Sequence, residues 1–268
     1  MDSGSGGLYS DDSITRRVNR ENVLLLGGGR ALLMQLAHPS VAAGVDEHSD
    51  FRRRPLYRLR RTIRLTMAIV FGDRETAMAA ARAVNHAHAA VRGEGYRAMD
   101  PDLLLWVHAT LIDSALVSYE TFVAPLTGDA RERFFQESKL LGTLLGIPED
   151  WFPRSFGDFT TYMDRMVTDG TVRVGPRALE LGRLVTRPRV LRIPGRLFLP
   201  LEIITAGLLP PSLRDQYGLP WGAARQRAFR LAVRTVPKIV AVTPAPLRVW
   251  PLPGHELGMS SAGARLTS

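Results

Sequence analysis

The segment from Asp100 to Pro125 constrains the fold more than any other part of this 268-residue chain. Its letters DPDLLLWVHATLIDSALVSYETFVAP place apolar residues three and four positions apart, which is the spacing of one helix face. Asp100 followed by Pro101 is a typical helix start, because aspartate favours the N-cap and proline fits the first turn. The segment therefore predicts a long helix that ends before Pro125.

Comparable patterns predict helices along most of the chain. We expect them at 22–38, 40–48, 56–71, 74–92, 129–145, 155–169, 176–186 and 221–236. No segment has a convincing run of strands, and the prolines from 188 to 220 predict short pieces joined by turns. The predicted fold is all-α, a single helical domain over 16–250 with an irregular, Pro-rich C-terminal part. Residues 1–15 and the tail 251–268 are predicted to be disordered.

Composition excludes several classes of site. The hydrophobic share of 45% is sufficient for a substantial core. The chain has no cysteine, which excludes disulfides, iron–sulfur clusters and thiolate metal sites. The first twenty residues lack the apolar region of a secretory signal, and the apolar stretch from Leu197 to Leu209 is too short for a membrane span. We therefore expect a cytoplasmic protein.

The net charge of +9 raises the question of an anionic partner. Lys139 and Lys238 are the only lysines, and an Arg-rich, Lys-poor composition is typical of a GC-rich coding sequence. The basic clusters at 52–64 and 225–238 nevertheless leave open a cofactor-free binder of nucleic acid or of a membrane surface. We do not predict nucleic acid as a partner, because no recognition motif is present and aromatic residues do not interleave with the arginines. Peripheral membrane contact stays open.

Two of the six histidines share the Ala-rich helix predicted at 74–92. At 100° per residue, His88 lies on the apolar face of Ala81, Val84 and Val91. His86 lies about 200° away, so the pair cannot bind one metal from this helix. No three histidines have the spacing of a zinc site, and a zinc hydrolase is therefore not supported.

A haem gives a physical reason for a single histidine on an apolar face, because the flat apolar group needs one neutral imidazole for its iron. Its two propionates favour nearby arginines. Arg58, Arg61 and Thr62 cluster on one flank of the helix predicted at 56–71, although a solvated arginine face explains them more simply. His108, on the apolar face of the helix predicted between Asp100 and Pro125, has the pattern of a hydrogen-bonded core residue.

The run His-Ala-Ala-Val-Arg at 88–92 resembles the segment that carries the proximal haem histidine in latex-clearing proteins, the bacterial rubber oxygenases. Arg58, Arg61 and Thr62 resemble that family's Arg, Lys and Thr cluster, with arginine in place of lysine. The segments 24–51, 106–114 and 204–221 resemble the broader superfamily, which includes the MpaB-type oxygenases of fungal meroterpenoid biosynthesis. The likeness covers about 16–250, most of the chain.

This resemblance implies a helical fold with a globin-like core that holds haem b, with His88 as the axial iron ligand. It implies an oxygenase that uses O2 to cleave an alkene, so the predicted substrate is an apolar small molecule, of the alkene or isoprenoid class. Val84 and Val91 would line the haem, while Arg58 and Thr62, with Arg61 behind them, would stabilise bound oxygen.

Several features depart from that family. Rubber oxygenases are longer and exported, and the MpaB-type proteins are membrane-anchored, so polyisoprene does not carry over as the substrate. Glu47 is the candidate for the family's catalytic glutamate, and His38 and His108 are secondary candidates near the haem. A haem-binding carrier or sensor without turnover uses the same residues and remains the alternative. The glycine triplet Gly27–Gly29 lacks the preceding strand and the Lys-Ser/Thr of a phosphate-binding loop. The sequence does not predict the oligomeric state.

Overall fold

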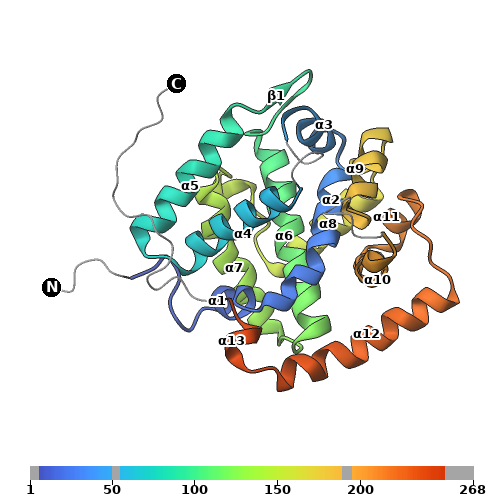
Figure 1. Cartoon of the computed structure of the whole chain (residues 1–268). Helices are drawn as coiled ribbons and strands as arrows, with labels where there is room; N and C mark the ends of the chain where they lie inside the picture. Colours follow the sequence, from blue (N-terminus) through green and yellow to red (C-terminus); the bar gives the residue numbers. More distant parts are fainter. Residues whose placement is uncertain (1–5, 50–54, 189–194, 251–268) are drawn as a thin grey trace.

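The computed structural model describes residues 6–49, 55–188 and 195–250, and within these ranges it confirms the all-α prediction (Figure 1). The helices are α1 (Ile14–Asn19), α2 (Gly28–Leu36), α3 (Pro39–His48), α4 (Pro55–Phe71), α5 (Arg74–Ala89), α6 (Pro101–Phe122), α7 (Gly128–Leu144), α8 (Phe156–Thr168), α9 (Pro176–Thr186), α10 (Leu199–Leu208), α11 (Pro211–Gln216), α12 (Ala223–Val242) and α13 (Ala245–Arg248). Short 3-10 helices are η1 (Asn22–Gly27), η3 (Glu149–Trp151) and η4 (Gly195–Phe198). The strands β1 (Arg92–Gly93) and β2 (Tyr96–Arg97) form one small antiparallel hairpin.

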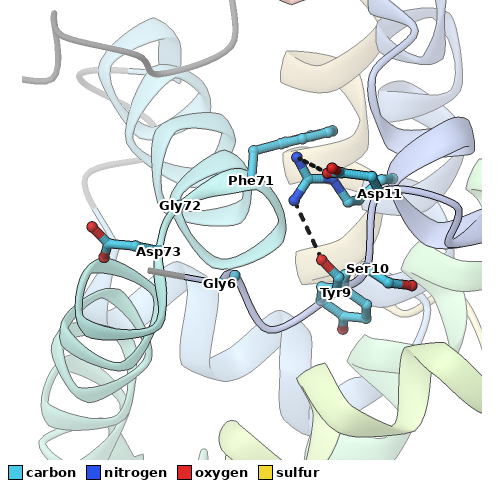
Figure 2. Close-up of a pocket in the computed structure, with 9 residues that line it drawn as sticks. Gly6, Tyr9, Ser10, Asp11, Phe71, Gly72 and Asp73 are labelled. Atoms are coloured by element: carbon cyan, nitrogen blue, oxygen red, sulfur yellow. Dashed lines mark hydrogen bonds and ion pairs between the residues drawn. The ribbon is translucent and has the colours of Figure 1, made fainter. Parts of the chain in front are cut away.

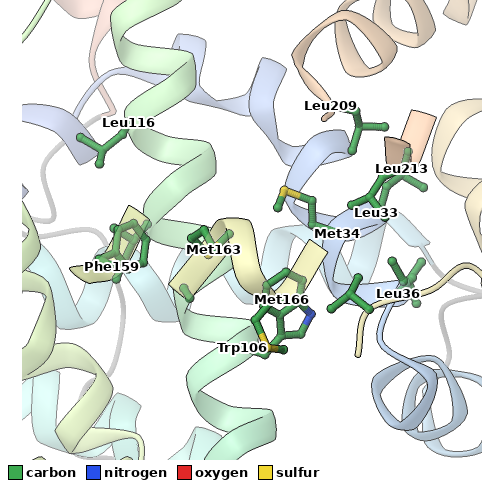
Figure 3. Packing of buried hydrophobic residues seen from close by; sticks show 14 of the residues in the cluster. Leu33, Met34, Leu36, Trp106, Leu116, Phe159, Met163, Met166, Leu209 and Leu213 are labelled. Atoms are coloured by element: carbon green, nitrogen blue, oxygen red, sulfur yellow. The ribbon is translucent and has the colours of Figure 1, made fainter. Parts of the chain in front are cut away.

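The segment from Asp100 to Pro125 forms α6, which lies in the middle of the helical body (Figure 1). Trp106 and Phe122 on α6 are fully buried. Around α6 the largest apolar cluster joins α2, α8, α9 and α11, and Figure 3 shows its members Leu33, Met34, Leu36, Leu116, Phe159, Met163, Met166, Leu209 and Leu213. Asp100 is the N-cap residue as predicted, but its carboxylate accepts from the backbone N–H of Arg97 at 2.9 Å and makes no capping bond.

Three helix boundaries differ from the sequence prediction. The first helix divides into η1 and α2 at Gly27. The Ala-rich helix ends at Ala89 because the chain then turns into the β1–β2 hairpin, where Gly95 takes φ +75°. Helix α12 continues through Pro237 to Val242. Proline there removes one helix hydrogen bond, but Val240 is buried against the body, which favours the longer helix.

The expectation of disorder does not hold for residues 6–15. Gly7 forms an isolated β-bridge with Asp73, Tyr9 is 5% exposed, and Ser13 caps α1. Composition missed this segment because a few apolar side chains, Leu8, Tyr9 and Ile14, anchor a mostly polar stretch to the core. Residues 1–5 and the predicted disordered tail 251–268 lie outside the described residues. No helix in the described ranges has both the length and the apolarity that a bilayer crossing requires.

The glycine triplet lets three helices approach closely. A Cβ at Gly27 would collide with Ser118 Oγ on α6, and a Cβ at Gly29 would collide with Thr205 on α10. Gly28, between them, has open space at its Cβ position. Packing therefore explains Gly27 and Gly29 without any bound phosphate.

We expect Gly27→Ala to destabilise the protein by about 1 to 3 kcal/mol, because the added methyl group overpacks the contact with α6. Gly28→Ala is the matched control: Gly28 already has helical φ and ψ angles, so alanine there is expected to be neutral or slightly stabilising. Urea unfolding of both variants measures the difference. Equal stability of the two variants would contradict the packing explanation.

Candidate functional site

Only Gly72 and Asp73 separate α4 from α5, and beyond this turn the two helices pack against each other. A Cβ at Gly72 would collide with the carbonyl oxygen of Ala68, and the Asp73 carboxylate accepts from the backbone N–H of Thr76 at 2.7 Å. The turn thus ends one helix and caps the next. In Figure 1, α4 and α5 leave this common turn, and α5 runs towards β1 while α4 runs towards the middle of the picture.

Near the turn the two helices pack tightly. Ala68 and Ile69 on α4 form one buried cluster with Ala80 and Ala81 on α5. The half-buried leucines of this cluster are Leu8, Leu65, Leu141, Leu144 and Leu145. Three alanines at the contact permit close approach of the helix axes. These residues identify which face of each helix points towards its neighbour.

The same faces continue to the far end of the hairpin. At 1.5 Å per residue, Arg58 and His88 both lie about 20 Å from the turn along their helices. At 100° per residue, Arg61 and Thr62 share the α4 face of Leu65 and Ile69. Arg61 and Thr62 are nevertheless exposed. The side chain of Arg58 lies outside the described part of the structure.

On α5 the burial pattern follows the phase expected from the sequence. Ala81 is buried, Val84 and His88 are half-buried, and His86 is exposed; Val91 is half-buried but lies beyond the end of the helix at Ala89. His88 therefore lies on the face that packs against α4 near the turn, whereas His86 points away from it. His88 on α5 and the exposed Arg61 and Thr62 on α4 thus lie on the sides of the two helices that pack together near the turn, with His88 about 6 to 7 Å farther from the turn.

Glu47 on α3 forms hydrogen bonds with side chains of β2 and α9. Its carboxylate accepts from the Tyr96 hydroxyl at 2.7 Å and from Arg177 Nη1 at 2.6 Å. These hydrogen bonds, from Tyr96 and then from Arg177, lower the pKa of Glu47. Beside it, His48 Nε2 lies 2.9 Å from the carbonyl oxygen of Arg92. The geometry gives Glu47 the contacts of a structural carboxylate between α3, β2 and α9, and its catalytic role stays a prediction.

His108 is a core residue in the structure. It is 4% exposed, its Nε2 lies 3.1 Å from the carbonyl oxygen of Ser138 on α7, and its ring meets Phe152 edge-on at 6.0 Å. Burial lowers the pKa of His108 to about 4. The imidazole is therefore neutral at pH 7 and donates a hydrogen bond that links α6 to α7.

His38 is the N-cap residue of α3 and is half-buried. Burial lowers the pKa of His38, and the charge of Asp102 opposes this shift. Its Nδ1 is buried without a hydrogen-bond partner among the described residues. His38 stays a secondary candidate.

We expect the pH dependence of stability to report the burial of His108. Its pKa is about 4 in the folded protein, against 6.5 for a histidine exposed to water, so the unfolded chain takes up the proton first. The contribution of His108 to stability is complete above pH 6.5 and is lost as the pH falls towards 4. Unfolding free energies measured at about pH 7.5 and about pH 5 should differ by about 2 kcal/mol more in the wild type than in His108→Gln.

His86→Gln is the control, because His86 is exposed. This variant should keep the pH dependence of the wild type. A loss of pH dependence in His86→Gln, or its persistence in His108→Gln, would contradict the assignment.

Two cavities lie elsewhere in the molecule. One, of about 340 Å³, is at the turn end of the α4–α5 hairpin and is lined by Gly6, Gly7, Tyr9, Ser10, Asp11, Arg16, Phe71, Gly72 and Asp73 (Figure 2). Arg16 crosses it, donating to the Tyr9 carbonyl oxygen at 3.4 Å and pairing with Asp11 at 3.3 Å. The other, of about 260 Å³, adjoins Glu21, Tyr119 and Arg248. His88 lines neither cavity.

Buried charges are the feature that sequence patterns did not anticipate. Arg30 is 5% exposed and bonds Ser114 Oγ, the Leu208 carbonyl oxygen and Asp113. Glu202 is 2% exposed between Arg187 and Arg225. In the sequence, the position of Glu202 within the apolar stretch from Leu197 to Leu209 could have indicated a buried charge. Among the described residues, no three of His, Cys, Asp and Glu converge as a metal-binding group.

From residue 15 to residue 238 the chain matches the family described as the catalytic domain of the ER-bound oxygenase mpaB/B′ and rubber oxygenase. The chain belongs to this family. Two uncharacterised proteins, from Mycobacterium bovis and Mycobacterium tuberculosis, are each 30% identical over 240 residues, which covers 82% of this chain and 92% of each relative. No solved structure matches.

Family membership confirms the resemblance seen in the sequence and supports an oxygenase-type enzyme at this coarse level. The family match does not test the cofactor, the residues of the site or the predicted domain limits at 16 and 250. They stay predictions.

Proposed function

We propose that this chain is a haem b-dependent oxygenase whose haem lies between the far halves of α4 and α5, with His88 as the axial iron ligand. The observation that carries the proposal is the position of three side chains on α4 and α5. His88 is half-buried on α5, about 23 Å from the turn along the helix, and Arg61 and Thr62 are exposed on α4, about 16 to 17 Å from the turn, on the face that is buried nearer the turn. Membership of an oxygenase family supports the same function.

The side chains on these surfaces fit a haem. The group requires apolar surface, one neutral nitrogen donor and cationic partners for its two propionates. On α5, Val84 lies one turn before His88 on the same side, and Val91 follows the end of the helix at Ala89. On α4, Arg61 supplies a guanidinium, and the exposed Tyr57, one turn away on the same side, adds apolar surface beside it. A haem iron needs one ligand from the protein, so a converging group of three is not required.

A bound haem supplies the iron chemistry that lets O2 cleave a carbon–carbon double bond into two carbonyl groups. The roles of the protein follow from its side chains. His88 holds the group through one ring nitrogen, and Arg61 pairs with a propionate. The hydroxyl of Thr62 is a hydrogen-bond donor for a reacting oxygen, and the apolar surfaces exclude water. The proposed substrate is an apolar alkene, of the isoprenoid class, because few polar groups converge here.

His88→Ala should abolish haem retention, because the variant loses the only proposed protein bond to iron. His86→Ala is the matched control on the same helix, and its exposed side chain should leave haem retention nearly unchanged. Absorption spectra and haem content of the purified variants measure the effect. Equal loss in both variants, or full retention in His88→Ala, would overturn the ligand assignment.

Thr62→Val should keep the haem and lower turnover on the order of 10- to 100-fold, because a hydrogen-bond donor near the reacting oxygen is lost. Arg60→Gln, about 160° away around α4, is the control and should turn over at the wild-type rate. Oxygen consumption and carbonyl products with squalene as the probe give the rates. A haem-loaded wild type that forms no carbonyl product from alkenes would instead indicate the alternative function, a haem carrier or sensor.

A further inference from the structure

Helix α12 lies along the outer edge of the helical body (Figure 1). Between Asp215 and Glu256 the sequence contains no acidic residue, and the basic residues of α12 are Arg225, Arg227, Arg230, Arg234 and Lys238. Arg225 turns inward and donates to Glu202 Oε1 at 2.7 Å. The other four basic residues are exposed. The outer side of α12 therefore carries positive charge that no acid on the same helix offsets.

The inner side of α12 packs against the helical body. Phe229, Ala232 and Val236 contact the cluster of Phe122, Ile204 and Leu208 on α6 and α10. Val240 continues this side and is buried. The apolar residues that attach α12 to the body are thus accounted for, and further apolar residues on its outer side need another explanation.

Three large apolar side chains of α12 face away from the body. Leu231 is 62% exposed, Ile239 is 60% exposed and Val242 is 80% exposed. Leu247, which follows on α13, is 70% exposed. At 100° per residue, Leu231, Ile239 and Val242 form one strip along the helix, directly beside the strip of Arg227, Arg230, Arg234 and Lys238. Exposure of such a contiguous apolar strip is a mark of an interaction surface.

We propose that the outer side of α12 is a docking surface for an anionic lipid membrane. A helix lying in the plane of a bilayer buries an apolar strip among the acyl chains and places arginine and lysine beside the lipid phosphates. The two strips of α12 match this arrangement in both polarity and charge. One bilayer surface would then contact both the four basic side chains and the three apolar side chains.

Two other occupants fit less well. A second copy of the chain would bring like charges together, because the surface is basic throughout. Nucleic acid would match the charge but would leave the apolar strip against a polar backbone. The membrane proposal is also independent of the haem, because none of its residues lies on α4 or α5. An apolar substrate partitions into bilayers, so docking there is compatible with the proposed function without depending on it.

The test is co-sedimentation of the full-length protein with vesicles of phosphatidylcholine, with or without phosphatidylserine, at physiological ionic strength. We expect binding to be about tenfold or more stronger to the phosphatidylserine vesicles. Leu231→Asn with Val242→Asn should weaken that binding about tenfold while the charge is unchanged. Arg234→Gln with Lys238→Gln should weaken it by a similar factor and reduce its salt dependence.

Matched controls lie outside α12. Leu140→Asn alters an exposed leucine of α7, and Arg154→Gln alters an exposed arginine, so both should bind vesicles as the wild type does. Thermal melting monitored by circular dichroism verifies that each variant is folded.

Absence of vesicle binding, equal binding to neutral and anionic vesicles, or equal loss in the control variants would overturn the proposal. Binding to duplex DNA without binding to vesicles would overturn it in favour of a nucleic-acid surface. A dimer in solution that Leu231→Asn dissociates, with no vesicle binding, would overturn it in favour of self-association. None of these measurements requires haem or catalytic turnover, so failure here leaves the proposed oxygenase function untouched.

Discussion

Gly72 and Asp73 force α4 and α5 into an antiparallel hairpin, and everything proposed for His88 depends on this reversal. A turn of two residues allows no freedom in which ends of the helices meet. The collision that a side chain at Gly72 would cause, and the cap that Asp73 provides, specify where each helix stops and starts. Because the alanines near the turn fix the facing sides, helix geometry then places His88, Arg61 and Thr62 on these sides, beyond the packed part of the hairpin.

Local patterns predicted much of this fold. Proline at the first turn correctly marked the start of α6, and the 100° rotation correctly separated buried Ala81 and half-buried His88 from exposed His86. Contacts between distant parts of the chain decided the rest. The break at Gly27 depends on Ser118, and the order of residues 6–15 depends on Tyr9 and on the bridge to Asp73. A sequence read in short windows contains none of these pairings.

The same limit applies to the site. Which side of α5 carries His88 followed from periodicity, but the hydrogen bond from His108 to Ser138 and the contacts of Glu47 join segments that periodicity cannot relate. Likewise, the sequence attributed the surplus of arginine to coding bias. The structure divides these arginines by environment: Arg30 and Arg225 neutralise Asp113 and the buried Glu202, whereas those on the outer side of α12 form a continuous basic surface.

The haem content of the purified protein, obtained from its absorption spectrum together with a pyridine haemochrome assay, tests whether the chain binds haem b. We expect a Soret band and one equivalent of haem b per chain, acquired during expression or taken up from added haemin. A protein that shows no Soret band and takes up no haemin would contradict this expectation.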